Sequence, residues 1–114
     1  MFKVLQVTLS EMDCMVINSI GWDAASEKFP NVNAYMLSAV KRKFQEAFNT
    51  GQFNHVATIA AIDLDEVFDI GNIGPEEKIA RHAPMHSVSV GDVIQTPEGE
   101  FFAVASMGFT KLEA

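Results

Sequence analysis

The sequence predicts a single α+β domain in which helices pack mainly on one face of an antiparallel or mixed sheet of four or five strands. Three observations predict this class. The chain has 114 residues, a usual length for one domain, so the range 1–114 is interpreted as one unit. Apolar and polar residues alternate near both ends of the chain, which is typical of half-buried strands. Between these ends, apolar residues recur at helical spacing beside capping residues.

The first strand and the first helix are predicted from local signals. Residues Phe2 to Leu9 alternate closely enough for a half-buried strand. Ser10 followed by Asp13 has the spacing of a capping box, which predicts a helix from Glu11 to Ile20. The apolar face expected for this helix consists of Met12, Val16 and Ile20. The single cysteine, Cys14, is expected to be a buried small hydrophobe in it.

Two further helices are expected before residue 50. A short one starts at Trp22-Asp23, with Asp23 as its cap, and Pro30 ends it. The longest helix of the chain is predicted from Ala34 to Asn49 and ends at Gly51. Its apolar face would consist of Leu37, Val40, Phe44 and Phe48.

The middle of the chain predicts a central strand and two short helices. Residues His55 to Ile62 are nearly all apolar, which favours a strand buried on both faces. Asp63 caps the next helix, which Gly71 is expected to end. Pro75 to His82 predicts one or two more helical turns, stopped by Pro84.

The C-terminal part predicts a hairpin and most of the candidate binding residues. Val88 and Val90 are expected to face the core, with Ser87 and Ser89 on the other side of the strand and Asp92 in the following turn. After a second turn at Pro97-Glu98-Gly99-Glu100, Phe101 and Phe102 must face opposite sides of their strand. One aromatic side chain of this hairpin is therefore expected on a binding surface. The candidates in this part are Ser87, Ser89, Asp92, Phe101 and Phe109.

Composition limits the partners and the compartment. Eight basic and fifteen acidic residues give a net charge of −7, which disfavours nucleic acid as a partner. Nine Phe and six Met in a small domain favour exposed apolar surface, and hence a protein partner or a homodimer. One cysteine and the lack of a long apolar run predict a cytoplasmic protein with no membrane partner.

No catalytic or metal-binding group is predicted. His82 and His86 have the i, i+4 spacing of many zinc ligands, but Pro84 lies between them and no third ligand follows. The carboxylates between Asp63 and Glu77 do not fit a calcium loop and are interpreted mainly as helix caps or as an acidic patch for a basic partner. No nucleophile, base and orienting acid can be assembled, and no cofactor is expected.

The remaining candidates lie on the predicted long helix. Lys41-Arg42-Lys43 is the only basic cluster and is expected on the solvated side of that helix. Tyr35, the only tyrosine, would lie near Arg42 and Glu46. Tyr35 and Arg42 are therefore a predicted contact point.

A resemblance adds a biological setting. The stretch Ser87-Val-Ser-Val-Gly-Asp-Val-Ile, with Phe101 to Ser106 and the corner Gly108-Phe109, resembles a signature of small uncharacterised proteins of bacteriophages and other mobile elements. The segment that starts at Asp63 is similar to what precedes that signature. The resemblance covers residues 55 to 112. It implies a phage or plasmid setting in the host cytosol, with a host or phage protein as the expected partner. This chain departs from it in the shorter, less polar tract from Gly74 to Met85.

The first functional hypothesis is a non-enzymatic accessory protein that binds another protein through an exposed hairpin aromatic and an acidic surface. The second is a single-stranded nucleic-acid binder that uses Lys41, Arg42 and Lys43 beside a stacking phenylalanine of the sheet. The third is a small-ligand-binding domain or an enzyme, with a pocket lined by His86, Ser87, Ser89 and Asp92.

Overall fold

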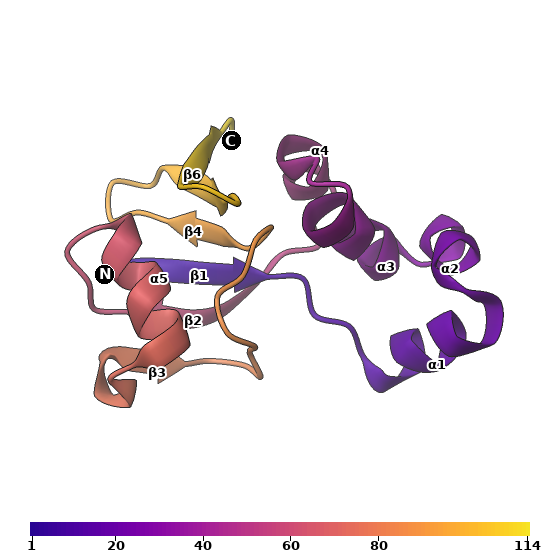
Figure 1. Cartoon of the computed structure of the whole chain (residues 1–114), viewed down its shortest axis with the longest axis horizontal. Coiled ribbons are helices and arrows are strands. Elements are labelled where there is room, and N and C mark those ends of the chain that lie inside the picture. Colours follow the sequence, from indigo (N-terminus) through magenta and orange to yellow (C-terminus); the bar gives the residue numbers. More distant parts are fainter.

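The protein forms one antiparallel sheet of six strands in the order β3-β2-β1-β4-β5-β6 (Figure 1). The structure is a computed structural model that describes residues 1–114. It confirms the α+β class, with six strands instead of four or five. The strands are β1 (Phe2–Gln6), β2 (Asn54–Ile59), β3 (Ile79–Arg81), β4 (Val93–Gln95), β5 (Phe101–Val104) and β6 (Phe109–Leu112).

The sixth strand lies where the sequence predicted a helix. Of the range 75–82, only Glu76–Lys78 is helical, as a single 3-10 turn, and Ile79–Arg81 then pairs with β2 as β3. The segment forms backbone hydrogen bonds with the edge of β2 and so becomes an edge strand. This pairing is long-range, and the helical spacing of the sequence does not reveal it. The opposite change occurs at Ser87–Val90, which is irregular although a strand was expected. Val88 is nevertheless buried, as predicted.

Helix α5 (Leu64–Ile73) covers one face of the sheet (Figure 1). The side chain of Asp63 accepts a hydrogen bond from the Glu66 backbone N–H at 2.9 Å, so the predicted cap is confirmed. The helix ends at Gly74 and not at Gly71 as predicted. Gly71 lies inside the helix, at a position where a Cβ would overlap the Val88 side chain packed against it. Close packing, and not a helix end, explains this glycine.

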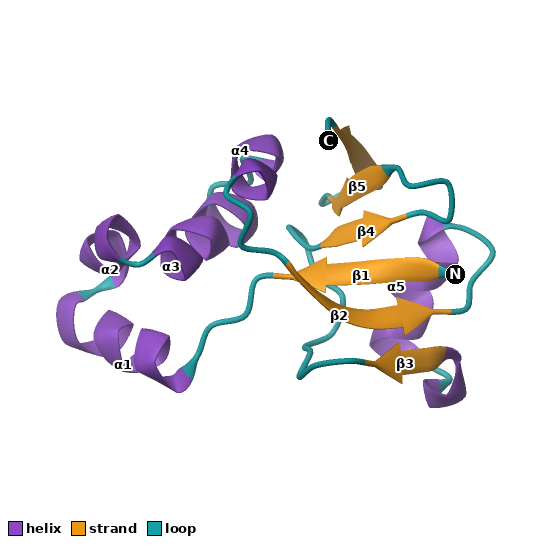
Figure 2. Ribbon diagram, turned by 180° about the vertical axis from the view of Figure 1, so that it is seen from behind, coloured by secondary structure: helices purple, strands orange, loops and turns teal.

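Four short helices form an arm beyond the ends of β1 and β2 (Figure 2). They are α1 (Glu11–Ile20), α2 (Trp22–Lys28), α3 (Pro30–Tyr35) and α4 (Phe44–Asn49), with a π-helical turn at Met36–Val40. The Ser10–Asp13 capping box of α1 is confirmed, with both reciprocal hydrogen bonds present at 3.0 and 2.9 Å. The arm has its own small core of Ile17, Ala25, Val32 and Met36. The molecule is consequently elongated, measuring 42 × 28 × 21 Å.

The prediction of one long helix from Ala34 to Asn49 is wrong. The chain bends at Arg42, whose φ of 55° places it in the left-handed region, and α4 starts again at Phe44. Val40 is 58% exposed, whereas Phe44 and Phe48 pack against the sheet. Apolar residues keep their helical spacing on both sides of Arg42, although tertiary packing changes the direction of the chain there. The spacing alone therefore could not locate the break.

Helix α1 packs by a narrower face than predicted. Met12 and Ile20 are exposed, and the buried positions are Asp13 and Ile17. Cys14 is exposed instead of buried. The cause is that only the other short helices of the arm cover α1, because the sheet lies too far away to do so.

Helices pack on both faces of the sheet and not mainly on one. Val4, Ile94 and Val104 belong to the main core beneath α5. On the other face, Val93, Ala103 and Leu112 form a second cluster that is covered by aromatic side chains, including Phe44 and Phe48 of α4. As predicted, Phe101 and Phe102 point to opposite faces, because alternate residues of a strand do so. No helix combines the length and the hydropathy that crossing a membrane requires.

Candidate functional site

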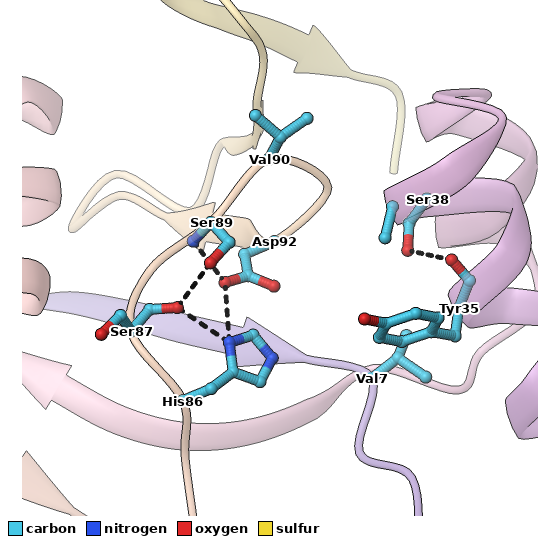
Figure 3. A pocket seen from close by; sticks show the side chains of 9 residues that line it. Val7, Tyr35, Ser38, His86, Ser87, Ser89, Val90 and Asp92 are labelled. Atoms are coloured by element: carbon cyan, nitrogen blue, oxygen red, sulfur yellow. Dashed lines mark hydrogen bonds and ion pairs between the residues drawn. The ribbon is translucent and has the colours of Figure 1, made fainter.

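A pocket of about 450 Å³ lies where the arm meets the sheet (Figure 3). One wall comes from the arm, a second from the chain just after β1, and the third from the loop that leads into β4. We call it the acceptor pocket, because most of the polar side chains that face it present hydrogen-bond acceptors. Its lining residues are Val7, Tyr35, Ser38, Ala39, His86, Ser87, Ser89, Val90 and Asp92.

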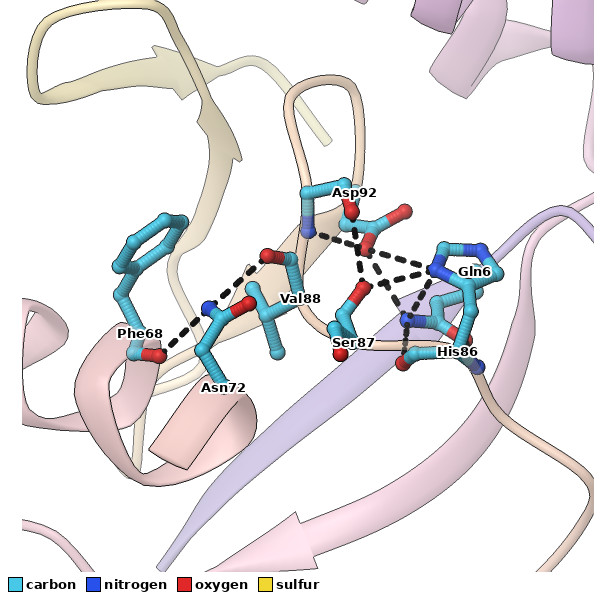
Figure 4. Close-up of polar contacts among 8 residues, drawn as sticks. Gln6, Phe68, Asn72, His86, Ser87, Val88 and Asp92 are labelled. Carbon is cyan, nitrogen blue, oxygen red and sulfur yellow. Dashed lines mark hydrogen bonds and ion pairs between the residues drawn. The ribbon is translucent and has the colours of Figure 1, made fainter. Parts of the chain in front are cut away.

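Gln6, at the end of β1, holds the loop wall in place (Figure 4). Its side chain is buried, and its amide donates to the His86 carbonyl at 2.9 Å and to the Asp92 carboxylate at 3.0 Å. Its side-chain oxygen accepts from the His86 backbone N–H at 3.2 Å. A buried amide with both ends bonded fixes the position of its partners. The loop is thus rigid although it has no regular secondary structure.

Asp92 is the central group of the pocket and is only 6% exposed. Its Oδ2 accepts from Gln6 and, at 2.8 Å, from the Ser89 backbone N–H. The other oxygen, Oδ1, accepts no hydrogen bond from the protein, and it points into the pocket, where it stays open to solvent (Figure 3). Burial raises the pKa of Asp92 to about 6, against the opposing effects of His86 and of the hydrogen bonds from Ser89 and Gln6. At neutral pH this carboxylate is therefore a largely desolvated negative charge with one free oxygen.

His86 lies beside Asp92, with Nδ1 3.8 Å from Oδ2. Nδ1 also lies 2.8 Å from the Ser87 carbonyl oxygen. The same nitrogen lies 3.2 Å from Gln6 Nε2, but the two hydrogens of that amide are directed to the His86 carbonyl and to Asp92. Since the Ser87 carbonyl can only accept, the contact with it assigns the proton of the neutral tautomer to Nδ1 and leaves Nε2 as an acceptor. The second nitrogen of the ring lies on the side of the pocket that Tyr35 faces (Figure 3).

The arm supplies Tyr35 and Ser38 to the opposite wall. Tyr35 stacks on Trp22 with ring centroids 5.6 Å apart, and its hydroxyl is directed toward the loop wall (Figure 3). Ser38 is buried in the π-helical turn, a distortion that is frequent at functional sites. At Gly91, with φ 95°, a Cβ would lie 2.9 Å from the Ser38 backbone carbon. This close approach joins the arm to the loop and closes the pocket.

Of the seven residues predicted from the sequence, the pocket brings together Tyr35, Ser87, Ser89 and Asp92. It does not include the other three. Arg42 hydrogen-bonds Ser106 and does not pair with Tyr35 as expected. Phe101 is half-buried against Phe48, with ring centroids 4.9 Å apart, so α4 covers the sheet face that a stacking phenylalanine would need.

Phe109 belongs to a different surface, which we call the acidic face. Two adjoining pockets of about 350 and 440 Å³ share Asp65 and Phe109. Exposed or half-buried apolar side chains lie among five carboxylates, and no lysine or arginine lines either pocket. The acidic face is defined by Ile62, Asp63, Asp65, Phe68, Asp69, Glu98, Glu100, Phe102 and Phe109.

The two histidines with zinc-like spacing lie apart. His82 contacts His55 and Thr58 on the sheet, with His82 Nε2 2.9 Å from the Thr58 hydroxyl. Burial, followed by the charge of His82, lowers the pKa of His55. His86 lines the acceptor pocket instead. No group of three metal-ligating side chains is present in the structure.

Sequence reasoning left Gln6 out of the site altogether. Gln6 occupies a core-facing position of β1, where a polar side chain needs buried partners. That conflict between pattern and residue type was the available signal. Comparison with known proteins adds no guide, because no family model, curated protein or solved structure matches this chain.

Proposed function

We propose that the protein is a non-enzymatic accessory protein of a bacteriophage or mobile element that binds another protein in the host cytosol. The observation that carries the proposal is the acidic face. Ile62 is 82% exposed and Phe68 37% exposed, beside the half-buried Phe102 and Phe109. Apolar side chains gathered among charges of one sign are typical of a protein-binding surface.

The chemistry of the acidic face selects the partner. Asp63, Asp65 and Asp69 come from the helix side, and Glu98 and Glu100 from the β4–β5 turn. Lys111 pairs with Glu100 at 2.7 Å, which leaves the other four carboxylates without a cationic partner in the structure. A segment rich in Lys and Arg with one apolar anchor is complementary to this surface. A second copy of the chain, with net charge −7, would be repelled there.

Geometry supports this function better than single-stranded nucleic-acid binding. The basic cluster Lys41-Arg42-Lys43 is exposed, but α4 covers the face that carries Phe101. The half-buried aromatic residues on the other face of the sheet, Phe102 and Phe109, lie among carboxylates, which repel phosphates. Of the basic cluster, Arg42 alone contacts this surface, through its hydrogen bond to Ser106 at the pocket that Phe109 lines, and the carboxylates there outnumber it. A stacking platform flanked by several cations is therefore not formed.

Selection from a random peptide library tests the proposal. We expect the selected peptides to combine Lys or Arg with an aromatic or aliphatic anchor and to bind less tightly as salt rises. The double variant Asp65→Asn, Asp69→Asn should weaken them about tenfold. The matched control is Glu27→Gln, Glu77→Gln, which removes the same charge from exposed positions elsewhere. Selected peptides without basic residues, or equal binding by both variants, would contradict the proposal.

The same variants serve in a cellular test. Tagged protein is recovered from host lysate with and without nuclease, and bound proteins are identified by mass spectrometry. The expected result is a nuclease-resistant partner that is retained by the control variant and lost by Asp65→Asn, Asp69→Asn. Loss of every partner on nuclease treatment would instead favour nucleic-acid binding.

A further inference from the structure

The acceptor pocket carries an inference that is independent of the acidic face. We propose that it binds a small organic cation, a guanidinium or primary ammonium group, with Asp92 Oδ1 as the anionic contact. Asp92 is almost fully buried, the protein's hydrogen bonds go to its Oδ2, and Oδ1 is the oxygen left open to the pocket. No lysine or arginine lines the pocket to neutralise it.

The hydrogen-bond inventory of the walls selects a ligand that donates. The Ser89 hydroxyl already donates to the Ser87 carbonyl at 2.9 Å, and the Ser38 hydroxyl to the Tyr35 carbonyl at 3.2 Å. His86 uses its Nδ1 proton on Ser87. What these three side chains offer the pocket is therefore lone pairs, together with the Asp92 carboxylate, and the Tyr35 hydroxyl can accept as well as donate. A guanidinium or ammonium group, which has several N–H donors and no acceptor, satisfies such walls.

Two further features favour a cation. Tyr35 adds an aromatic ring and a hydroxyl to the same pocket, and aromatic rings attract cations at close range. Gln6 and the Ser89 N–H both bond Oδ2, so they orient the carboxylate with Oδ1 toward the cavity before any ligand arrives. A pre-oriented, partly desolvated acceptor makes a stronger charge-assisted hydrogen bond than an exposed one.

The test compares butylguanidine with butylurea, which has nearly the same shape but no charge. Both are titrated at pH 7.5 while NMR follows the backbone amides of residues 86–92 and the Tyr35 ring. We expect saturable shifts at these positions, with butylguanidine bound at least about tenfold more tightly. Equal binding of the two compounds, or shifts confined to other residues, would overturn the proposal.

Asp92→Asn removes the charge and keeps a side chain that can accept from Gln6 and Ser89. It should weaken butylguanidine binding at least about tenfold. Glu77→Gln, an exposed position away from the pocket, makes the same charge change and should leave binding intact. Unchanged binding by folded Asp92→Asn would refute the assignment of Asp92.

A measurement on the unaltered protein guards against a folding defect in that variant. His86 and Tyr35 are the other titratable groups that line the pocket. Since the pKa of Asp92 is about 6, affinity for butylguanidine should fall about tenfold between pH 7.5 and pH 5. An affinity independent of pH in this range would contradict the proposal.

The source of the cation is decided by a further pair of probes. Agmatine represents a free metabolite-like guanidine, and N-acetyl-arginine amide represents an arginine side chain within a protein. Tight binding of agmatine alone indicates a small-molecule ligand. Comparable binding of both probes indicates a pocket open enough for a protein side chain, and binding of neither would overturn the proposal.

Discussion

The sheet with α5 has a much larger buried core than the helical arm. The main core beneath α5 contains ten buried residues from four strands, a helix and the loop before β4, whereas the arm core contains four from the short helices and the π-helical turn. The acidic face belongs entirely to the sheet half, but the acceptor pocket needs both halves, since Tyr35 and Ser38 come from the arm. Binding in the pocket is thus coupled to docking of the arm, and binding at the acidic face is not.

The largest expected effect comes from matched truncations of the two cores. Ile59→Ala, at a fully buried position of the sheet, should lower the free energy of unfolding by about 4 kcal/mol. Ile17→Ala in the arm should cost about 2 kcal/mol, because Ile17 is buried among fewer neighbours. Urea unfolding measures the first, and amide hydrogen exchange measures local opening of α1 to α3 in the second. A global loss of protection in Ile17→Ala would contradict the division into two stability units.

The next effect is the pH dependence caused by Asp92. Its pKa rises from 3.8 to about 6 on folding, so the folded state binds the proton more tightly. The stability from this group is fully present below pH 3.8 and is lost as the pH rises through 6, a difference of about 3 kcal/mol. Relative to Asp92→Asn, the wild type should gain stability between pH 7 and pH 4. Parallel pH profiles of the two proteins in urea unfolding would rule this out.

Docking of the arm is tested by a matched pair of glycines. Gly91→Ala and Gly99→Ala both place a side chain at positive φ, 95° and 90°, but only the first meets the Ser38 backbone. The shared backbone strain costs about 1 kcal/mol, and the collision should add about 2 kcal/mol to Gly91→Ala. Hydrogen exchange should show the added loss at the arm and the loop wall. Equal losses for the two variants would mean that this contact does not hold the arm.

The smallest expected effects compare two helix caps. Ser10→Ala removes the side-chain cap of α1, and Asp63→Ala removes that of α5. Each should cost about 1 kcal/mol. The first should increase exchange only within the arm, and the second should lower the midpoint of urea unfolding. If Ser10→Ala moved the global midpoint equally, the arm and the sheet would unfold as one unit.

Part of the acceptor pocket could be predicted from the sequence. Ser87, Ser89 and Asp92 are close in the chain, and the turn chemistry of Gly91-Asp92 is local, so these residues were predicted together. Tyr35 was singled out for another reason, and Gln6 was not singled out at all. Both lie more than fifty residues from the loop in the chain, and only the packing of the arm and the ladder between β1 and β4 brings them to it.

Local signals in the sequence by themselves determined the α+β class, the start of α1 and α5, and the turns of the C-terminal strands. The hydrogen bonds of a capping box or a turn join residues within four positions, so they do not depend on contacts with distant segments. The break at Arg42, the strand β3 and the burial of Asp92 were decided only by the tertiary structure. Each depends on contacts between distant segments, which in this chain outweighed the local preference for a continuous helix, a helical turn and a hydrated carboxylate.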